Sequence, residues 1–129
     1  MTEKLTILGS TGSIGTQALD VCKLGGIEVV ALTANGSVDI IEAQIREFAP
    51  KYAALVDEEA AKELKERVSD TETVIFSGKE GVCRCAEADE ADTVLNSIVG
   101  MAGLEPTLRA IKKRKKILPI IFFLFLDSF

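Results

Sequence analysis

Three glycines, Gly9, Gly12 and Gly15, follow the first apolar run of the sequence at intervals of three residues. A glycine-rich turn between a strand and a helix lets the backbone approach a phosphate closely, and the first amide groups of the helix then point at the phosphate oxygens. The hydroxyl groups of Ser10, Thr11 and Ser13 can add further donors. The GxxGxxG spacing differs from the commoner GxGxxG, and such a turn by itself is also compatible with a purely structural role.

The elements around this turn favour the phosphate-binding interpretation. Residues 5–8 form a short β-rich run, and apolar residues then recur at helical spacing over 14–22. Further strands are predicted at 27–32, 52–56, 74–76, 93–99 and 117–118, and helices at 37–48, 58–68, 79–88 and 103–112. Alternation of this kind predicts an α/β fold with a doubly wound parallel sheet, as in Rossmann-like NAD(P)-binding domains. In that fold the turn after the first strand is where a dinucleotide pyrophosphate binds.

The turn after the second predicted strand reads Asn35, Gly36 and Ser37. It has no carboxylate to bind a ribose 2′-hydroxyl, which leaves room for a 2′-phosphate. It also has no lysine or arginine, so it fits equally well an ordinary polar loop in which Ser37 caps the next helix. Later in the chain, Gly100 and Gly103 allow either backbone approach to a nicotinamide or a simple turn, and both interpretations stay open here.

Composition excludes several other classes of function. The 129 residues contain no histidine, which excludes histidine acid–base catalysis and histidine-ligated metals in this chain. Residues 1–111 carry a net charge of −9 and residues 112–129 one of +4, and an acidic body argues against nucleic-acid binding. Three cysteines without a CxxC pattern are typical of a reduced, cytoplasmic protein. We expect neither a signal peptide nor a membrane span, because the apolar run after residue 116 is too short.

Two blocks resemble the N-terminal domain of the 1-deoxy-D-xylulose 5-phosphate reductoisomerases. They read LTILGSTGSIG at residues 5–15 and IVGMAGLEPTLRAI at residues 98–111. The resemblance implies an oxidoreductase of the non-mevalonate pathway of isoprenoid biosynthesis, which rearranges a ketose phosphate and reduces the product with NADPH. It also implies a cytoplasmic homodimer that depends on magnesium, manganese or cobalt. The residues expected to bind cofactor are Gly9, Ser10, Thr11, Gly12, Ser13, Ile14, Gly15, Asn35, Gly36 and Ser37.

The chain departs from the family pattern in two places. Many members have lysine and then asparagine where this chain has Gly36 and Ser37. After residue 118 the family continues with a Leu-Ala-Asn-Lys-Glu motif and a catalytic domain, whereas this chain ends in an apolar tail at 119–129. We expect residues 1–118 to form the NADPH-binding domain and the tail to reflect truncation or a frameshift. No catalytic or metal-binding residue is assigned.

Two other hypotheses compete with this one. The chain is alternatively a stand-alone nucleotide-binding regulatory domain without catalysis, or a remnant that binds nothing.

Overall fold

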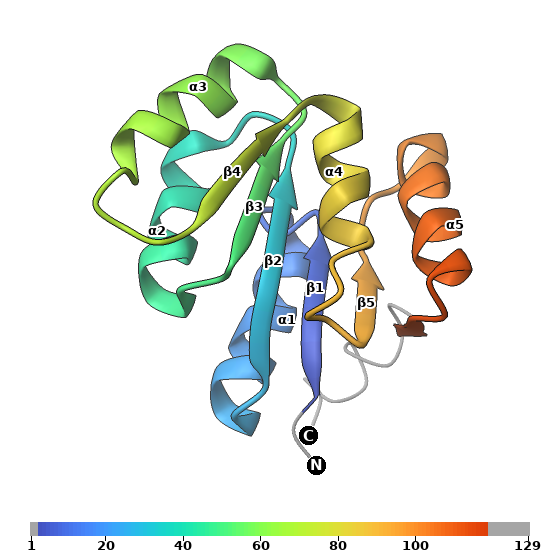
Figure 1. Cartoon of the computed structure of the whole chain (residues 1–129). Helices are drawn as coiled ribbons and strands as arrows, with labels where there is room; N and C mark the ends of the chain where they lie inside the picture. The colour runs from blue at the N-terminus through green and yellow to red at the C-terminus, as the bar shows by residue number, and fades with distance from the viewer. Residues whose placement is uncertain (1–2, 119–129) are drawn as a thin grey trace.

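Six parallel strands form a single sheet in the computed structural model, which describes residues 3–118 (Figure 1). The strand order is β4-β3-β2-β1-β5-β6, and all neighbours are parallel. The predicted doubly wound parallel sheet is therefore confirmed. The expectation for the tail at 119–129 lies outside the described residues. The strands are β1 (Lys4–Leu8), β2 (Glu28–Ala34), β3 (Tyr52–Leu55), β4 (Val74–Ser77), β5 (Thr93–Asn96) and β6 (Lys116–Leu118).

Helices cover both faces of this sheet. One hydrophobic cluster joins α1, α2 and α3 to the sheet, and a second joins α4 and α5 to the opposite face. Figure 1 shows α4 in front of the sheet and α1 behind it. None of the helices within residues 3–118 combines the length and apolar character needed to cross a bilayer. The helices are α1 (Ser13–Gly25), α2 (Val38–Phe48), α3 (Glu58–Arg67), α4 (Gly78–Ala86) and α5 (Leu104–Lys112), with a 3-10 turn, η1, at Gly100–Gly103.

The central strand β1 shows why the sheet must lie between helices. Its residues 5–8 are all buried, with Leu5 and Ile7 in the cluster of the first face and Leu8 in that of the second. Apart from Thr6, these residues form an apolar run, which is typical of a parallel strand that is buried on both faces. On the second face, α5 is also joined to α4 by ion pairs, because Arg109 of α5 donates to Glu80 of α4 and to Glu87, the residue after α4.

The polar residues that precede α3 and α2 differ in whether they cap their helix. Asp57 caps α3, since its carboxylate accepts a hydrogen bond from the amide of Ala60 at 3.1 Å. Ser37 occupies the residue before α2, but its side chain makes no capping hydrogen bond. The interpretation of Ser37 as a side-chain cap is therefore wrong.

The predicted strand at 93–99 ends at Asn96, three residues earlier than expected. The Asn96 side chain accepts a hydrogen bond from the amide of Ile98 at 2.9 Å, which bends the chain out of the sheet. The apolar residues Ile98 and Val99 consequently extend the strand pattern in the sequence but not in the fold.

Glu90 links the loop before β5 to the start of β3, and this contact predicts a pH-dependent stability. Lys51 and the Tyr52 hydroxyl donate to its carboxylate at 2.7 and 2.9 Å. The hydrogen bond from the Lys51 ammonium is the main cause that lowers the pKa of Glu90 to about 2. Because the pKa is depressed in the folded state, this stabilisation is present above the ordinary pKa of 4.5 and is lost as the pH falls towards 2.

We expect Glu90→Gln to lower the free energy of unfolding by about 0.5–1 kcal/mol at neutral pH, since the pair is partly exposed. The difference from the native chain should disappear near pH 2, as measured by urea unfolding across pH. Glu66→Gln, at an exposed position in α3, is the matched control. An equal loss at all pH values would contradict the ionic explanation.

Candidate functional site

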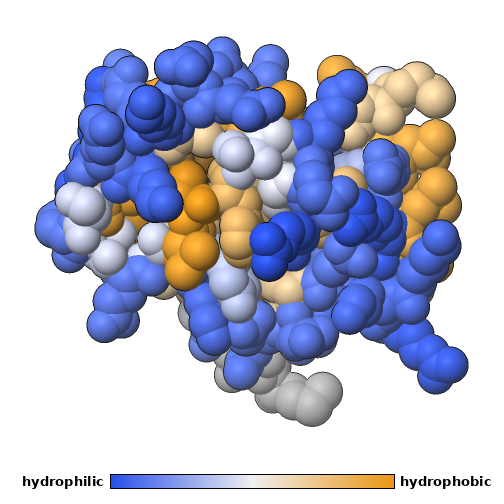
Figure 2. Space-filling view, turned by 45° about the horizontal axis from the view of Figure 1, so that its top comes forward, coloured by the Kyte–Doolittle hydropathy of each residue, from blue (hydrophilic) through white to orange (hydrophobic). Residues whose placement is uncertain are grey.

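A cavity of about 630 Å³ lies at the carboxyl ends of the central strands. Its walls come from the turn after β1, the ends of β2 and β3, the segment after β5, and one side each of α4 and α5. The volume is in the range of small-molecule sites, roughly 300–1,000 Å³. The cavity also lies between β1 and β5, where the strand order reverses: β2, β3 and β4 lie on one side of β1, and β5 and β6 lie on the other. Such switch points are where open α/β sheets bind ligands. Figure 2 views the carboxyl-end side and shows hydrophobic residues exposed between hydrophilic ones.

The glycine turn is anchored from β2 by one residue. The Thr33 carbonyl accepts hydrogen bonds from the amides of Gly9 and Ser10 at 3.0 and 2.8 Å, and the Thr33 hydroxyl also accepts from Gly9 at 3.1 Å. These two amides are thereby occupied. Ligand binding by this turn must therefore use the amides that follow, from residue 11 into the first turn of α1.

Ser10 departs from its predicted role as a hydroxyl donor. Its side chain is buried and donates to the Gln44 carbonyl at 2.7 Å, while the Gln44 amide donates back to the Ser10 carbonyl at 2.9 Å. Since Ser10 faces α2 and not the cavity, the expectation that its hydroxyl reaches a ligand is wrong. Its contact with Gln44 instead holds the turn in place.

Gly12 and Gly15 have opposite surroundings. A Cβ on Gly15 would lie 2.1 Å from the Gly9 carbonyl oxygen and 2.7 Å from the Ser10 Cα, so α1 can approach the turn only because Gly15 has no side chain. A Cβ on Gly12 would meet nothing within 4 Å, and Gly12 lines the cavity. Gly15 is thus required for packing, whereas Gly12 leaves open space beside the backbone.

The first turn of α1 offers its amide groups to this space. Gly12 is the residue before the helix and supplies no side-chain cap, and the first turn carries no acidic residue. Uncapped amides at a helix start carry a partial positive charge and bind anions. The Thr16 hydroxyl donates to the Gly12 carbonyl oxygen at 2.5 Å, so this hydroxyl does not occupy the amides of the first turn.

The predicted residues therefore separate into groups. Gly9, Thr11, Gly12 and Asn35 line the cavity, Ser13 and Ile14 begin α1 beside it, and Ser10 and Gly15 support the turn from behind. Gly36 and Ser37 instead line a shallow pocket on the other side of the loop, together with Arg67 of α3.

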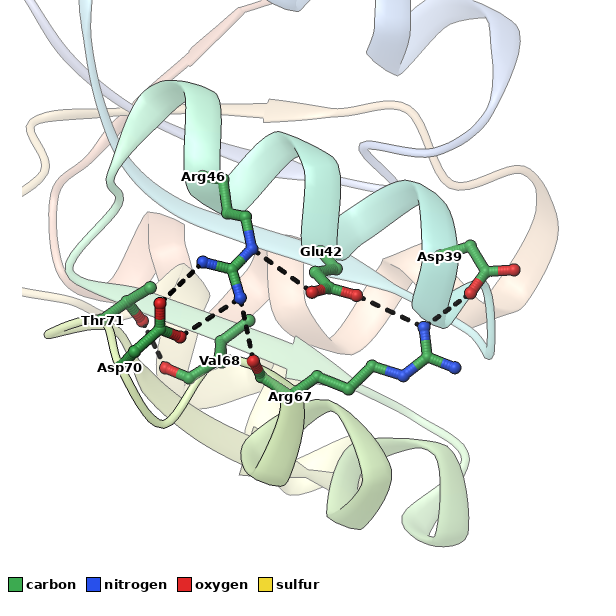
Figure 3. A network of polar contacts seen from close by, with 7 residues as sticks. All are labelled: Asp39, Glu42, Arg46, Arg67, Val68, Asp70 and Thr71. Carbon is green, nitrogen blue, oxygen red and sulfur yellow. Dashed lines mark hydrogen bonds and ion pairs between the residues drawn. The ribbon is translucent and has the colours of Figure 1, made fainter.

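Arg67 is held there by carboxylates. It donates to Asp39 at 2.6 Å and to Glu42 at 3.3 Å, and it also pairs with Glu63. Figure 3 shows how Asp39, Glu42 and the neighbouring Arg46 fix α2 to α3 through this network. These carboxylates neutralise the positive charge of Arg67, and the pairs with Asp39 and Glu42 also join α3 to α2.

The segment after β5 closes the other end of the cavity. Ser97 lines the cavity, and its hydroxyl lies 2.7 Å from the Leu8 carbonyl oxygen and 2.8 Å from that of Gly9. A Cβ on Gly103 would lie 2.6 Å from the Asn96 side-chain nitrogen. The absence of a side chain at Gly103 therefore allows the turn to pack against Asn96. Met101 and Ala102, which follow Gly100, contribute to the cavity wall.

Thiol chemistry is disfavoured in the cavity. Cys83 lines it, and burial raises the pKa of this thiol. Burial also raises the pKa of Cys85 to about 12. All three cysteines are buried and free. Burial therefore disfavours the thiolate form of both cysteines of α4.

Sequence reasoning missed three residues that position the site: Thr33, Gln44 and Ser97. Gln44 alone left a signal, because it is a polar residue between Ile41 and Ile45 on the buried side of α2. The other two are ordinary strand-end residues whose partners are distant in sequence.

The sequence of the chain is similar to those of known proteins. The sequence profile of the 1-deoxy-D-xylulose 5-phosphate reductoisomerases matches residues 5–119. The enzyme of that name from Agathobacter rectalis is 46% identical over 116 residues, and the one from Desulfitobacterium hafniense is 49% identical over 117 residues. Each alignment covers 89% of this chain but only 30% and 31% of the relative. The chain therefore spans about 30% of the length of these relatives.

Solved structures of reductoisomerases superpose on the same part of this chain. The reductoisomerase of Zymomonas mobilis in complex with NADPH superposes with a TM-score of 0.84 at 33% identity, over 91% of this chain and 31% of that one. A reductoisomerase in complex with NADPH, fosmidomycin and magnesium gives a TM-score of 0.85 at 36% identity, over 91% and 29%.

The contrast between the two glycines predicts different costs of substitution. We expect Gly15→Ala to lower the free energy of unfolding by about 3 kcal/mol, because the new methyl group overlaps the Gly9 carbonyl oxygen. Gly12→Ala should change it by less than about 1 kcal/mol, since the space is open and the backbone is extended. Urea unfolding of both variants measures the two changes in the free energy of unfolding. Similar losses in the two variants would show that the turn is packed differently.

Proposed function

The chain belongs to the 1-deoxy-D-xylulose 5-phosphate reductoisomerase family, and we propose that residues 3–118 bind NADPH as the cofactor domain of such an enzyme. Since the chain spans about 30% of its relatives' length, the rearrangement and reduction of the ketose phosphate are proposed for a whole enzyme of this kind. NADPH, when bound, supplies the hydride for the reduction. The residues here bind and orient it.

The open space beside Gly12, at the start of an uncapped helix, is the observation that carries this proposal. The pyrophosphate would lie there, on the amides that follow Ser10. Asn35 and the end of β3 would contact the adenosine, and Ile98 to Ala102 would contact the nicotinamide. This arrangement follows the carboxyl edge of the sheet, as expected for a dinucleotide.

The described residues offer no site for a divalent metal ion. Within residues 3–118, no group of three or more potential ligands lies close enough to bind an ion. For residues 3–118 the proposal is therefore cofactor binding without a metal-dependent step.

The cytoplasm is the proposed location, supported by the free, buried thiols. A homodimer is proposed on the family resemblance. The exposed apolar side chains of Leu104, Leu108 and Ile111 on α5 are compatible with further contacts, either with another copy or with the remainder of a longer enzyme.

Titration with NADPH and NADH, followed by fluorescence of the reduced nicotinamide, tests the proposal. We expect saturable binding of NADPH with a preference over NADH. Binding only of a different nucleotide would favour a regulatory domain, and no saturable binding of any nucleotide would favour a remnant that binds nothing.

Gly12→Leu should abolish NADPH binding, because its side chain would fill the space proposed for the pyrophosphate. The urea midpoint should stay close to that of the native chain, since no protein atom lies within 4 Å of the new Cβ. Gly25→Leu, the same change at the exposed far end of α1, is the control that should bind normally. Unchanged NADPH affinity in the Gly12 variant would refute the proposed pyrophosphate position.

A further inference from the structure

A single lysine lines the cavity. Within the part of the chain that the structure describes, the charged residues of the cavity wall are Lys79 and Glu105. Lys79 is exposed, and no carboxylate of the described residues lies within ion-pairing distance of it. Glu105 lies on α5 beside Arg109, at the end formed by the segment after β5. Arg109 also pairs with Glu80, the residue after Lys79, so one guanidinium is shared by the carboxylates of α4 and α5.

The packing of α4 places Lys79 at the adenosine end. A Cβ on Gly81 would lie 2.9 Å from the Phe76 Cβ and 3.6 Å from the Ala54 Cβ, so the start of α4 lies over β4 and β3. Ala54 pairs with Thr33, one residue before the last residue of β2. Lys79 precedes Gly81 and, with Asn35 and Val56, lines the cavity beyond these strand ends.

The opposite side of the Asn35–Ser37 loop is unsuited to a phosphate. The pockets there are lined by Asp39, Asp57 and Glu63 among other acidic residues, and a Cβ on Gly36 would lie 3.9 Å from an Asp57 carboxylate oxygen. Arg67 on that side is already paired with three carboxylates. A dianionic 2′-phosphate placed there would meet mostly negative charge, which costs free energy.

We propose that Lys79 binds the 2′-phosphate of NADPH and determines the preference of this chain for NADPH over NADH. The lysine thus supplies from α4 the positive charge that the turn after β2 lacks. This inference rests on the proposed function and adds to it the side of the loop on which the phosphate lies. Lys79 carries one unpaired ammonium, which suits a point contact with phosphate oxygens.

Nucleotide titrations of the full 129-residue chain test the assignment. We expect Lys79→Met to weaken NADPH binding about tenfold while NADH affinity changes less than about twofold, since only NADPH carries the 2′-phosphate. Adenosine 2′,5′-bisphosphate and 5′-AMP should show the same contrast without the nicotinamide. Lys79→Arg should keep most of the preference, and higher ionic strength should reduce it in the native chain more than in Lys79→Met.

Lys62→Met is the matched control, because Lys62 is an exposed lysine on the acidic side of the same loop. It should leave the ratio of the two affinities unchanged. An equal loss of NADPH and NADH affinity in Lys79→Met would place the lysine on the pyrophosphate and overturn the assignment, as would an unchanged ratio. A reduced ratio in Lys62→Met alone would place the phosphate on the other side.

These outcomes separate the inference from the proposed function. A native chain that binds no NADPH overturns both. A native chain that binds NADPH with an unaltered preference in Lys79→Met overturns the lysine assignment and leaves cofactor binding intact.

Discussion

The carbonyl oxygen of Thr33 is the point on which the turn after β1 depends. It accepts the amides of Gly9 and Ser10, and so couples the end of β1 to the end of β2. Gln44 holds the same turn from α2, and Ser97 holds it from the segment after β5. With the turn fixed on three sides, α1 begins at a defined place and its free amides face the cavity. Gly15 completes the constraint, because only a residue without a side chain allows this contact between helix and turn.

Much of the fold could be predicted from apolar periodicity. All six strands lie where β-rich runs indicated them, and the buried central strands are the most apolar, as is typical of parallel sheets. The errors lie at the ends of elements, where a single side-chain hydrogen bond decides. The predicted strand at 93–99 continues as an apolar run through Val99, yet the side chain of Asn96 ends it. The helix start at Asp57 was predictable because the capping partner, Ala60, is local.

The site could be predicted only in part, for a related reason. The glycines report on local backbone geometry, so Gly9, Gly12 and Gly15 were found from spacing alone. Ser10 looked like a ligand donor because its partner, Gln44, is far away in sequence. The positive charge of the cavity could not be predicted from the turn after β2. That turn contains no cation, whereas Lys79 lines the same cavity from the start of α4.

The unequal surroundings of two glycines three residues apart have an evolutionary consequence. Gly15 is needed for the packing of α1 against the turn, so selection for a stable fold alone favours its retention. A side chain at position 12 would meet open space, and only a bound molecule would give natural selection a reason to exclude one. In a lineage that no longer used the cofactor, Gly12 would drift while Gly15 stayed invariant. The pattern of variation at these two positions among close relatives therefore records whether the cavity is still in use.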